Sequence, residues 1–456
     1  MPRTRTLLTF SGFALLTAAL VACGNQATVQ TPAATGTGAT LQTLAVSYAG
    51  KYGYVHTLSI PATLSKTSLQ TAYGGKILAF NPELGSAIVA NNVSTKQTYD
   101  MTVEVNANNI KLGDVKALGF SAWSTGFSAW STGYSAWSTG YSAWSTGTTS
   151  AATTFSENLT AWNAVRLADA QTLVPELGRG IKVAVIDTGI DLNHGAFAGH
   201  LDTVNMKDFL LNTSTPQEVD SSTVVGTYAD GYGHGTAVAD LILQIAPNAT
   251  ILPLRVLDGN GGGDIQTIAS AISYAVSSGA KVINLSLGST TDSSAINSAI
   301  ASAVSKGVTV IEASGNTGDT NVLYPAHNAY GVQQNTSSAQ VNGSVSVGSV
   351  TTGLLKSSFS TYGPNLELVA PGEALKTAFP GNNTVLATGT SFAAPVVSGA
   401  IVLALSTGLV PSASKFDVDA MLSNLDSTAT ASTDPLFASQ LGKGTINVYN
   451  FVHKYR

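Results

Sequence analysis

The chain has 456 residues, which is long enough for about three domains of roughly 150 residues each. Charged residues make up 10% of it and apolar residues 44%, which excludes a disordered chain, since that would be rich in charge and poor in apolar residues. A net charge of −5 with no basic block argues against nucleic-acid binding, and the single cysteine excludes an internal disulfide framework or a multi-cysteine metal site.

The N-terminus has the pattern of an export signal. Arg3 and Arg5 are followed by an uncharged stretch, Leu7–Ala22, which is shorter than a membrane-spanning helix of about 20 apolar residues. The stretch leads into LVACG, a segment that resembles the lipobox of bacterial lipoproteins, whose signal is cut before a cysteine that receives diacylglycerol. We predict a signal peptide over residues 1–22 and a lipidated Cys23 that holds the protein to the cell envelope only through acyl chains. An ordinary signal peptide with Cys23 incidental, and a protein released outside the cell, is the alternative.

A small folded unit is expected after a flexible tether. Residues 23–44 are small and polar, which is typical of a linker. Residues 45–118 predict an α+β unit, because short apolar alternations are separated by turn residues. Its expected helix and three strands lie at Ser65–Tyr73, Lys76–Phe80, Ser86–Ala90 and Met101–Val105.

Residues 119–156 contain a repeat with a period of seven. FSAWSTG begins at Phe120 and recurs, with Phe or Tyr in the first position, at Phe127, Tyr134 and Tyr141. Each unit contains Gly, Ser and Thr, which are poor helix formers, and no charged residue, so a coiled coil is not expected. Two interpretations stay open: a low-complexity spacer, or an aromatic platform for sugar or cell wall.

Strands and helices alternate over residues 157–456. Apolar runs predict four buried strands, at Val183–Ile186, Ala249–Leu257, Lys281–Leu287 and Val308–Ala313. Apolar residues three and four apart predict amphipathic helices between the strands, and Gly279 and Gly307 stand where two such helices end. This alternation predicts an α/β fold with a doubly wound, mostly parallel sheet and a functional site at the carboxyl ends of its strands.

Three short motifs carry candidate catalytic residues. Asp187 ends the strand VAVID, where a carboxylate after four apolar residues needs a partner. His234 opens a helix in GHGTAVADLI, and Ser391 lies in ATGTSFAAP before an apolar helix. A serine hydroxyl becomes a strong nucleophile when a histidine takes its proton and an acid orients that histidine. Each residue alone also fits an ordinary structural role, such as a turn cap or a helix N-cap.

Together the motifs resemble those of the subtilisin-like serine peptidases, the subtilase family. VAVIDTGID (Val183–Asp191), DGYGHGT (Asp230–Thr236) and GTSFAAP (Gly389–Pro395) are similar to the aspartate, histidine and serine motifs of that family. The chain order Asp, His, Ser also matches the family and differs from the order in α/β-hydrolases. The resemblance covers residues 157–452 and implies the subtilisin-like α/β fold.

The resemblance implies a role for each candidate residue. Ser391 would attack the scissile carbonyl, His234 would take and return the proton, and Asp187 would hold the imidazole. Asn316, in the sequence ASGN, is similar to the oxyanion-hole asparagine of the family and would donate to the developing O⁻ together with the Ser391 backbone N–H. The implied reaction is hydrolysis of peptide bonds through an acyl-enzyme, for which no cofactor is expected.

The resemblance also implies a substrate cleft. A glycine-rich edge and an S-L-G strand would pair with an extended peptide and read its backbone more than its side chains. A third segment would line the pocket for the residue that precedes the scissile bond, and Leu323 stands where it would intrude on that pocket. These cleft residues are Gly261, Gly262, Gly263, Ser286, Leu287, Gly288, Ala313, Ser314 and Gly315.

Partners and metals follow from the same resemblance. We expect a monomer that acts on protein or peptide substrates. The unit at residues 45–118 is similar to subtilase prodomains and would act as an intramolecular inhibitor, so the protein would be made as a zymogen. No metal site is predicted, because the stretch from His234 to Pro247 is too short for the calcium loop of many relatives, although other structural calcium sites stay open.

Two other functions compete with this interpretation. One is a non-catalytic envelope binding or adhesion protein on a subtilase scaffold. The presence of all four residues, Asp187, His234, Asn316 and Ser391, argues against it. The other is an esterase of lipids or sugar esters, which the peptide-shaped cleft motifs disfavour.

Overall fold

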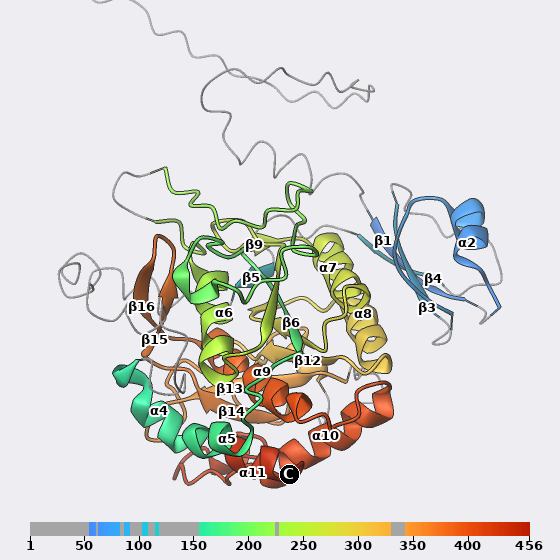
Figure 1. Ribbon diagram of the computed structural model, residues 1–456. Helices are drawn as coiled ribbons and strands as arrows, with labels where there is room; N and C mark the ends of the chain where they lie inside the picture. The colour runs from blue at the N-terminus through green and yellow to red at the C-terminus, as the bar shows by residue number, and fades with distance from the viewer. Residues whose placement is uncertain are drawn as a thin grey trace, which may run out of the picture. The chain divides into compact units, whose positions relative to one another are not determined.

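The computed structural model describes residues 54–60, 63–82, 86–91, 103–107, 115–117, 155–223, 228–329 and 343–456 (Figure 1). The predicted signal peptide, the lipidation site Cys23, the tether and nearly all of the tryptophan repeat lie outside these residues. Across the described ranges, no helix combines the length and the apolar character needed to cross a membrane.

The N-terminal unit is an antiparallel sheet with one helix. Its strands follow the order β2-β3-β1-β4, in which β1 pairs antiparallel with both β3 and β4. Helix α2 begins where the Ser65 side chain accepts a hydrogen bond from the Ser68 N–H, and it ends at Gly74, whose φ of 70° suits glycine. Its elements are β1 (Tyr54–Ser59), α2 (Lys66–Tyr73), β2 (Lys76–Asn81), β3 (Ser86–Asn91) and β4 (Val103–Ala107).

The larger unit is built on a seven-stranded parallel sheet. Its strand order is β14-β13-β12-β10-β6-β8-β7. The chain enters at β6, then adds β7 and β8 on one side and the later strands on the other, so the strand order reverses at β6. Such a reversal opens a crevice at the carboxyl ends of the central strands. The strands are β6 (Lys182–Asp187), β7 (Lys207–Asp208), β8 (Thr250–Arg255), β10 (Val282–Leu285), β12 (Thr309–Ala313), β13 (Val345–Val350) and β14 (Leu368–Pro371).

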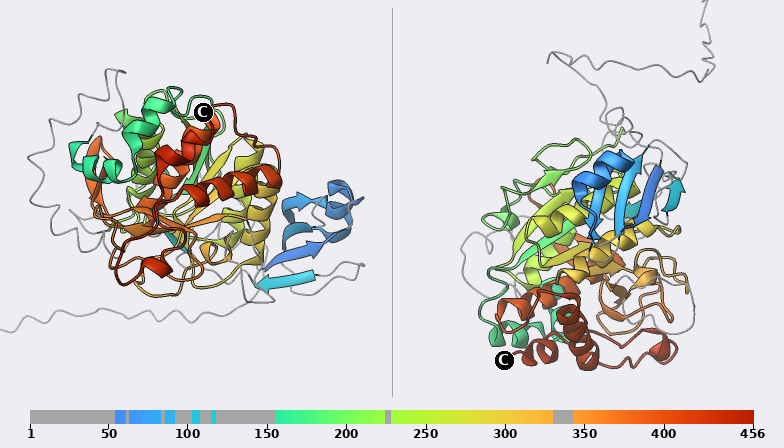
Figure 2. Two further views of the ribbon diagram at one scale, coloured as in Figure 1. Left: turned by 90° about the horizontal axis from the view of Figure 1, so that it is seen from below. Right: turned by 90° about the vertical axis from the view of Figure 1, so that its right-hand side faces the viewer.

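Helices cover both faces of this sheet (Figures 1 and 2). Helices α6 and α9 pack together on one face, and α7 and α8 pack together on the other. Helix α9 is buried along nearly its whole length, as expected of a helix that is apolar all round. The helices are α4 (Leu159–Ala164), α5 (Leu167–Leu173), α6 (His234–Ile245), α7 (Ile265–Ser277), α8 (Ser294–Ser305), α9 (Thr390–Ser406), α10 (Lys415–Thr428) and α11 (Val448–His453), and a hairpin of β15 (Leu375–Phe379) and β16 (Asn383–Ala387) lies beside α6.

The predicted α/β fold with a doubly wound parallel sheet is confirmed. The four predicted strands correspond to β6, β8, β10 and β12, with ends that differ by at most two residues. Gly279 and Gly307 follow α7 and α8 with φ angles of 81° and 78°, the left-handed conformation that lets a helix end in a sharp turn. Strands β13 and β14 were not predicted, because VSVGSV and LVAP are short and contain Ser, Gly or Pro.

Candidate active site

Asp187 and His234 form a buried pair at the carboxyl end of the central strand. Asp187 is the last residue of β6, and His234 is the first residue of α6. The His234 Nδ1 and Asp187 Oδ1 atoms lie 2.7 Å apart, and the two side chains are 3% and 1% exposed. Asp187 Oδ1 also accepts a 2.7 Å hydrogen bond from the Thr188 N–H. The buried carboxylate therefore has the partner that its position in the sequence requires.

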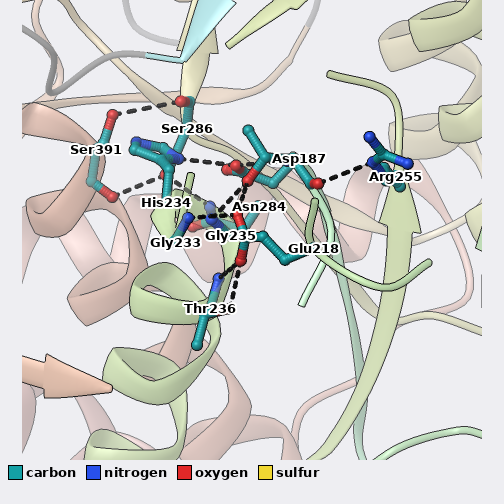
Figure 3. A network of polar contacts seen from close by, with 11 residues as sticks. Asp187, Glu218, Gly233, His234, Gly235, Thr236, Arg255, Asn284, Ser286 and Ser391 are labelled. Carbon is teal, nitrogen blue, oxygen red and sulfur yellow. Dashed lines mark hydrogen bonds and ion pairs between the residues drawn. The ribbon is translucent and has the colours of Figure 1, made fainter. Parts of the chain in front are cut away.

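Ser391 lies at the N-terminus of α9, beside this pair. Figure 3 shows His234 between Asp187 and Ser391. The Ser391 hydroxyl donates a 3.3 Å hydrogen bond to the Ser286 carbonyl oxygen, and the Ser286 hydroxyl donates in return to the Ser391 carbonyl oxygen at 2.8 Å. The imidazole packs against the ring of Phe392, with 5.4 Å between the ring centroids. The three predicted triad residues are thus brought together from β6, α6 and α9.

Asn316 is tied to the same helix start. Its Oδ1 atom accepts hydrogen bonds from the Thr390 N–H at 2.9 Å and from the Thr390 hydroxyl at 3.0 Å. Because a backbone N–H can only donate, the oxygen end of the amide faces Thr390 and the Nδ2 end is left as a donor. Thr390 directly precedes Ser391, so the Asn316 amide and the Ser391 backbone N–H lie at the positive end of α9.

The two predicted cleft edges lie on either side of a segment of the same chain. Strands β9 (Gly262–Gly263) and β11 (Leu287–Gly288) each pair antiparallel with β5 (Val115–Ala117), which lies between them. Gly261 forms the turn before β9 with a φ of 78°, and Ser286 directly precedes β11. The cleft therefore holds a third strand through main-chain pairing, as it would hold an extended peptide.

Comparison with known proteins decides the family. Residues 178–444, more than half of the chain, match the Subtilase family. The chain belongs to the subtilase family. It is 34% identical over 285 residues to thermitase of Thermoactinomyces vulgaris, which covers 60% of this chain and 89% of thermitase. Its identity to subtilisin DY of Bacillus licheniformis is 33% over 280 residues, covering 59% and 90% of the two chains.

The solved structures agree on the fold. A protease of Pseudoalteromonas arctica, 24% identical, superimposes with a TM-score of 0.54 over 65% of this chain and 97% of its own. The family and its subtilisin and thermitase relatives make this subtilase a serine-type endopeptidase.

In this subtilase the predicted pocket wall, residues 313–315, exposes no side chain of its own to the pocket. Ala313 and Ser314 are fully buried, and the Ser314 hydroxyl accepts a 2.7 Å hydrogen bond from the Thr361 hydroxyl. Gly315 lies against Leu323, since a Cβ atom on Gly315 would stand 2.9 Å from the Leu323 Cγ atom. Leu323 therefore covers this part of the wall, and its intrusion on the substrate pocket stays a prediction.

A chain of hydrogen bonds that the sequence did not predict holds the backbone of Ser391. The Ser398 hydroxyl donates to Asn284 Oδ1 at 2.9 Å, and Asn284 Nδ2 donates to the Ser286 hydroxyl at 2.8 Å. Ser286 in turn bonds the Ser391 carbonyl oxygen. A helix-buried serine and a strand asparagine are common core residues, so neither gave a signal in the sequence.

Glu218 is a further residue that sequence reasoning missed. It is 5% exposed and accepts hydrogen bonds from residues beside Asp187 and His234 (Figure 3). Burial raises the pKa of Glu218 to about 7, although hydrogen bonds from Thr188 and Thr236 act to lower it. Glu218 lies in a polar loop without a motif, but both threonines belong to the DTG and GHGT motifs and could have pointed to a shared partner.

No metal centre accompanies these residues in the part of the chain that the structure covers. Within the described ranges, no group of three or more His, Cys, Asp or Glu side chains could hold a metal ion. The candidate active site comprises an acid–histidine pair, a serine at a helix start, an amide donor and two strand edges.

Proposed function

We propose that this subtilase is an exported endopeptidase that hydrolyses peptide bonds through an acyl-enzyme on Ser391. The observation that carries the proposal is the buried 2.7 Å contact between Asp187 and His234, with Ser391 at the adjacent start of α9. A proton on His234 Nδ1, donated to Asp187, leaves Nε2 as the proton acceptor. This is the tautomer that a general base for a serine hydroxyl requires.

The reaction would proceed in two halves. Ser391 Oγ bonds to the substrate carbonyl carbon while His234 takes the hydroxyl proton. His234 then returns this proton to the leaving amine, the C–N bond breaks, and an ester to Ser391 remains. A water molecule next gives a proton to His234 and attacks the ester carbon, and Ser391 leaves with the returned proton. Every step is a proton or acyl transfer, so the chemistry requires no cofactor.

The developing oxyanion would be held by two N–H groups. Asn316 Nδ2 is left as a donor because Thr390 occupies the oxygen end of the amide. The Ser391 backbone N–H is the second donor, at the positive end of α9. Donors that are fixed before the charge develops stabilise the transition state without reorganisation.

Main-chain pairing supports a peptide as the substrate. Strands β9 and β11 bind β5 on both sides by antiparallel pairing, which recognises an extended backbone. A lipid or a sugar ester has no row of amide groups for these edges. An esterase function is accordingly not proposed.

Residues 45–118 would act as the prodomain of this enzyme. The support is β5, because a segment of the chain that occupies the cleft excludes other peptides. Processing just beyond Ala117 would give a mature N-terminus directly after β5, within the stretch that leads into the tryptophan repeat. N-terminal sequencing of the active protein tests this, and a mature N-terminus upstream of residue 110 would contradict it.

Export and anchoring rest on the N-terminal sequence. The signal-like residues 1–22 and the lipobox-like position of Cys23 support a precursor that is lipid-anchored at the bacterial cell envelope. Labelling of cells with a radioactive fatty acid tests the anchor. The label should be found on the full-length precursor and be absent from the Cys23→Ala variant, whereas an unlabelled parent would point to an ordinary signal peptide.

A fluorophosphonate probe tests the central proposal. The chain without its signal peptide, after its own processing, should take one adduct on Ser391, located by peptide mass spectrometry. Ser391→Ala and His234→Ala should take none. A processed and folded protein without an adduct would contradict the proposal and favour a binding protein on the same scaffold.

A further inference from the structure

Glu218 is a buried carboxylate that the mechanism above leaves without a role. Its segment runs beside the residues that follow β6: the Ile190 N–H donates to the Pro216 carbonyl oxygen and the Glu218 N–H donates to the Ile190 carbonyl oxygen, both at 3.0 Å. This pairing places the carboxylate between the end of β6 and the start of α6 (Figure 3).

Four donors converge on this carboxylate. The Gly233 N–H donates to Oε1 at 2.8 Å, and the Thr236 N–H donates to Oε2 at 3.2 Å. The hydroxyls of Thr188 and Thr236 also donate, one to each oxygen. Thr188 directly follows Asp187, while Gly233 and Thr236 stand on either side of His234. The donors therefore come from both halves of the catalytic pair.

The two threonine hydroxyls are fixed in the donor direction. The Gly235 N–H donates to the Thr188 hydroxyl at 3.0 Å, and the Asp191 N–H donates to the Thr236 hydroxyl at 2.9 Å. Each hydroxyl has one proton, which then goes to Glu218. An ionised carboxylate accepts hydrogen bonds from all four donors. A protonated carboxyl or a glutamine amide would instead point a hydrogen of its own toward one of these donors, and at least one hydrogen bond would be lost.

We propose that Glu218 is a positioning residue of the proteolytic reaction, whose ionised carboxylate ties the end of β6 to the start of α6 and so holds Asp187 and His234 aligned for proton transfer. This inference rests on the function proposed above. It assigns to Glu218 no contact with substrate, so its effect should fall on the rate of the chemical step and leave peptide binding unchanged.

The charges around Glu218 make this role sensitive to pH. Arg255 binds the Thr188 carbonyl oxygen at 3.1 Å, but its charge is paired with Asp208 at 2.8 Å. Burial and the nearby charge of Asp187 raise the pKa of Glu218 to about 7. Activity would need a neutral His234 and an ionised Glu218. As the pH rises from the acid side, each of these two groups must therefore lose one proton before the enzyme is active. The titratable and charged groups around Glu218 are Asp187, Asp191, Asp220, Tyr232, His234 and Arg255.

The test compares Glu218→Gln with a matched control. Glu367→Gln replaces another buried glutamate, 2% exposed, whose pKa burial raises to about 9 and whose partner is Asp426, away from the catalytic pair. The full chain is used after its own processing, with a chromogenic peptide amide as substrate and the final extent of fluorophosphonate labelling as the count of assembled sites. Glu218→Gln should lower kcat per labelled site about 100-fold, with KM within about twofold of the parent, because small misalignments of reacting groups cost rates of this order.

The pH profile separates positioning from mere support of the fold. The logarithm of kcat/KM of the parent and of Glu367→Gln should fall on the acid side with a slope near 2, and that of Glu218→Gln with a slope near 1. A Glu218→Gln variant with parental kcat per labelled site would overturn the inference. If Glu218→Gln does not fold, Thr188→Val, which removes one of the four donors to the carboxylate, is measured in the same way, and parental kcat per labelled site in that variant would overturn it. An unlabelled parent would instead contradict the proposed function itself.

Discussion

Strand β12 and the turn that follows it carry two polar side chains whose hydrogen-bonding environments differ. Asn316, just beyond the strand, has its carbonyl oxygen held by two donors of Thr390 and its amide end left to donate. Glu312, inside the strand, is fully buried, and burial raises its pKa to about 8, with only the Ser344 hydroxyl acting to lower it. Only four positions separate Asn316, whose amide is oriented by two hydrogen bonds, from Glu312, whose protonated form burial favours.

The comparison extends to the two glutamates. Glu218 and Glu312 are both almost completely removed from water, yet the pKa of Glu218 is raised only to about 7 and that of Glu312 to about 8. Hydrogen-bond donors to the ionised form distinguish the first environment from the second. Near Asp187 and His234, desolvated groups have partners that also orient them, whereas in the interior of β12 the same burial lowers stability.

Removing the Asn316 side chain should have the largest effect on kcat. Asn316→Ala deletes the side-chain donor of the proposed oxyanion hole while Thr390 and Ser391 stay in place. We expect kcat to fall by about 10²–10³, the loss that removal of such a donor causes in subtilisin, with little change in KM. Steady-state kinetics on a peptide amide, with sites counted by fluorophosphonate labelling, measure this.

A second substitution sharpens the same point. Thr390→Val removes one of the two hydrogen bonds to Asn316 Oδ1 but keeps the backbone N–H and the donor itself. Its loss in kcat should lie between parent and Asn316→Ala. Thr428→Val, which removes another largely buried threonine hydroxyl, is the control and should retain parental kcat. If Thr390→Val matched this control, the orientation of Asn316 would not depend on the Thr390 hydroxyl.

Replacing Glu312 should change the stability of the fold instead of the rate of the reaction. The folded-state pKa of Glu312, about 8, lies above its ordinary value of 4.5, so the folded state binds more protons between these pH values. The free energy of unfolding therefore falls as pH rises through this window. Glu312→Gln has no proton to lose, and at pH 8 we expect it to be more stable than the parent by on the order of 3 kcal/mol. Urea unfolding at pH 5 and pH 8 measures this.

The stability experiment needs two precautions. Both proteins should carry Ser391→Ala, so that self-digestion does not distort the unfolding curves. Glu373→Gln, at a partly exposed glutamate, is the control for the replacement of a carboxyl by an amide. Equal loss of stability between pH 5 and pH 8 in the parent and in Glu312→Gln would remove Glu312 as its cause.

The sequence predicted the parts of this arrangement that depend on local pattern. Apolar runs predicted four central strands; Asp187 ends the first of them and Asn316 lies three residues beyond the last, while His234 and Ser391 stand in the first turns of α6 and α9. Such positions are fixed by chain order in a parallel sheet, because carboxyl ends meet at one edge. The glycine edge at β9 and the S-L-G edge at β11 were predicted from their resemblance to family motifs.

What the sequence could not predict depends on contacts between distant segments. Glu218 meets Thr188 and Thr236 across 30 and 18 residues, through a loop whose length follows no pattern. The roles of Thr390 and Asn284 depend on which atom of an amide faces which donor, and no periodicity encodes that. Strand β1 escaped prediction because it mixes polar and apolar residues and is completed only by β3 and β4.

The smallest expected effect concerns Leu323. Its side chain lies against Gly315, which stands between Glu312 and Asn316 in the sequence. Leu323→Gly should open the pocket wall without touching Asn316 or Ser391. We expect the ratio of kcat/KM for peptides with Phe before the scissile bond to kcat/KM for peptides with Ala there to rise about 10-fold, the usual range for a few methylene groups in an apolar pocket. Matched peptide amides that differ only at that residue measure the ratio. An unchanged ratio with parental kcat for the Ala peptide would mean that Leu323 covers Gly315 without limiting the pocket, and that the wall is set by backbone alone.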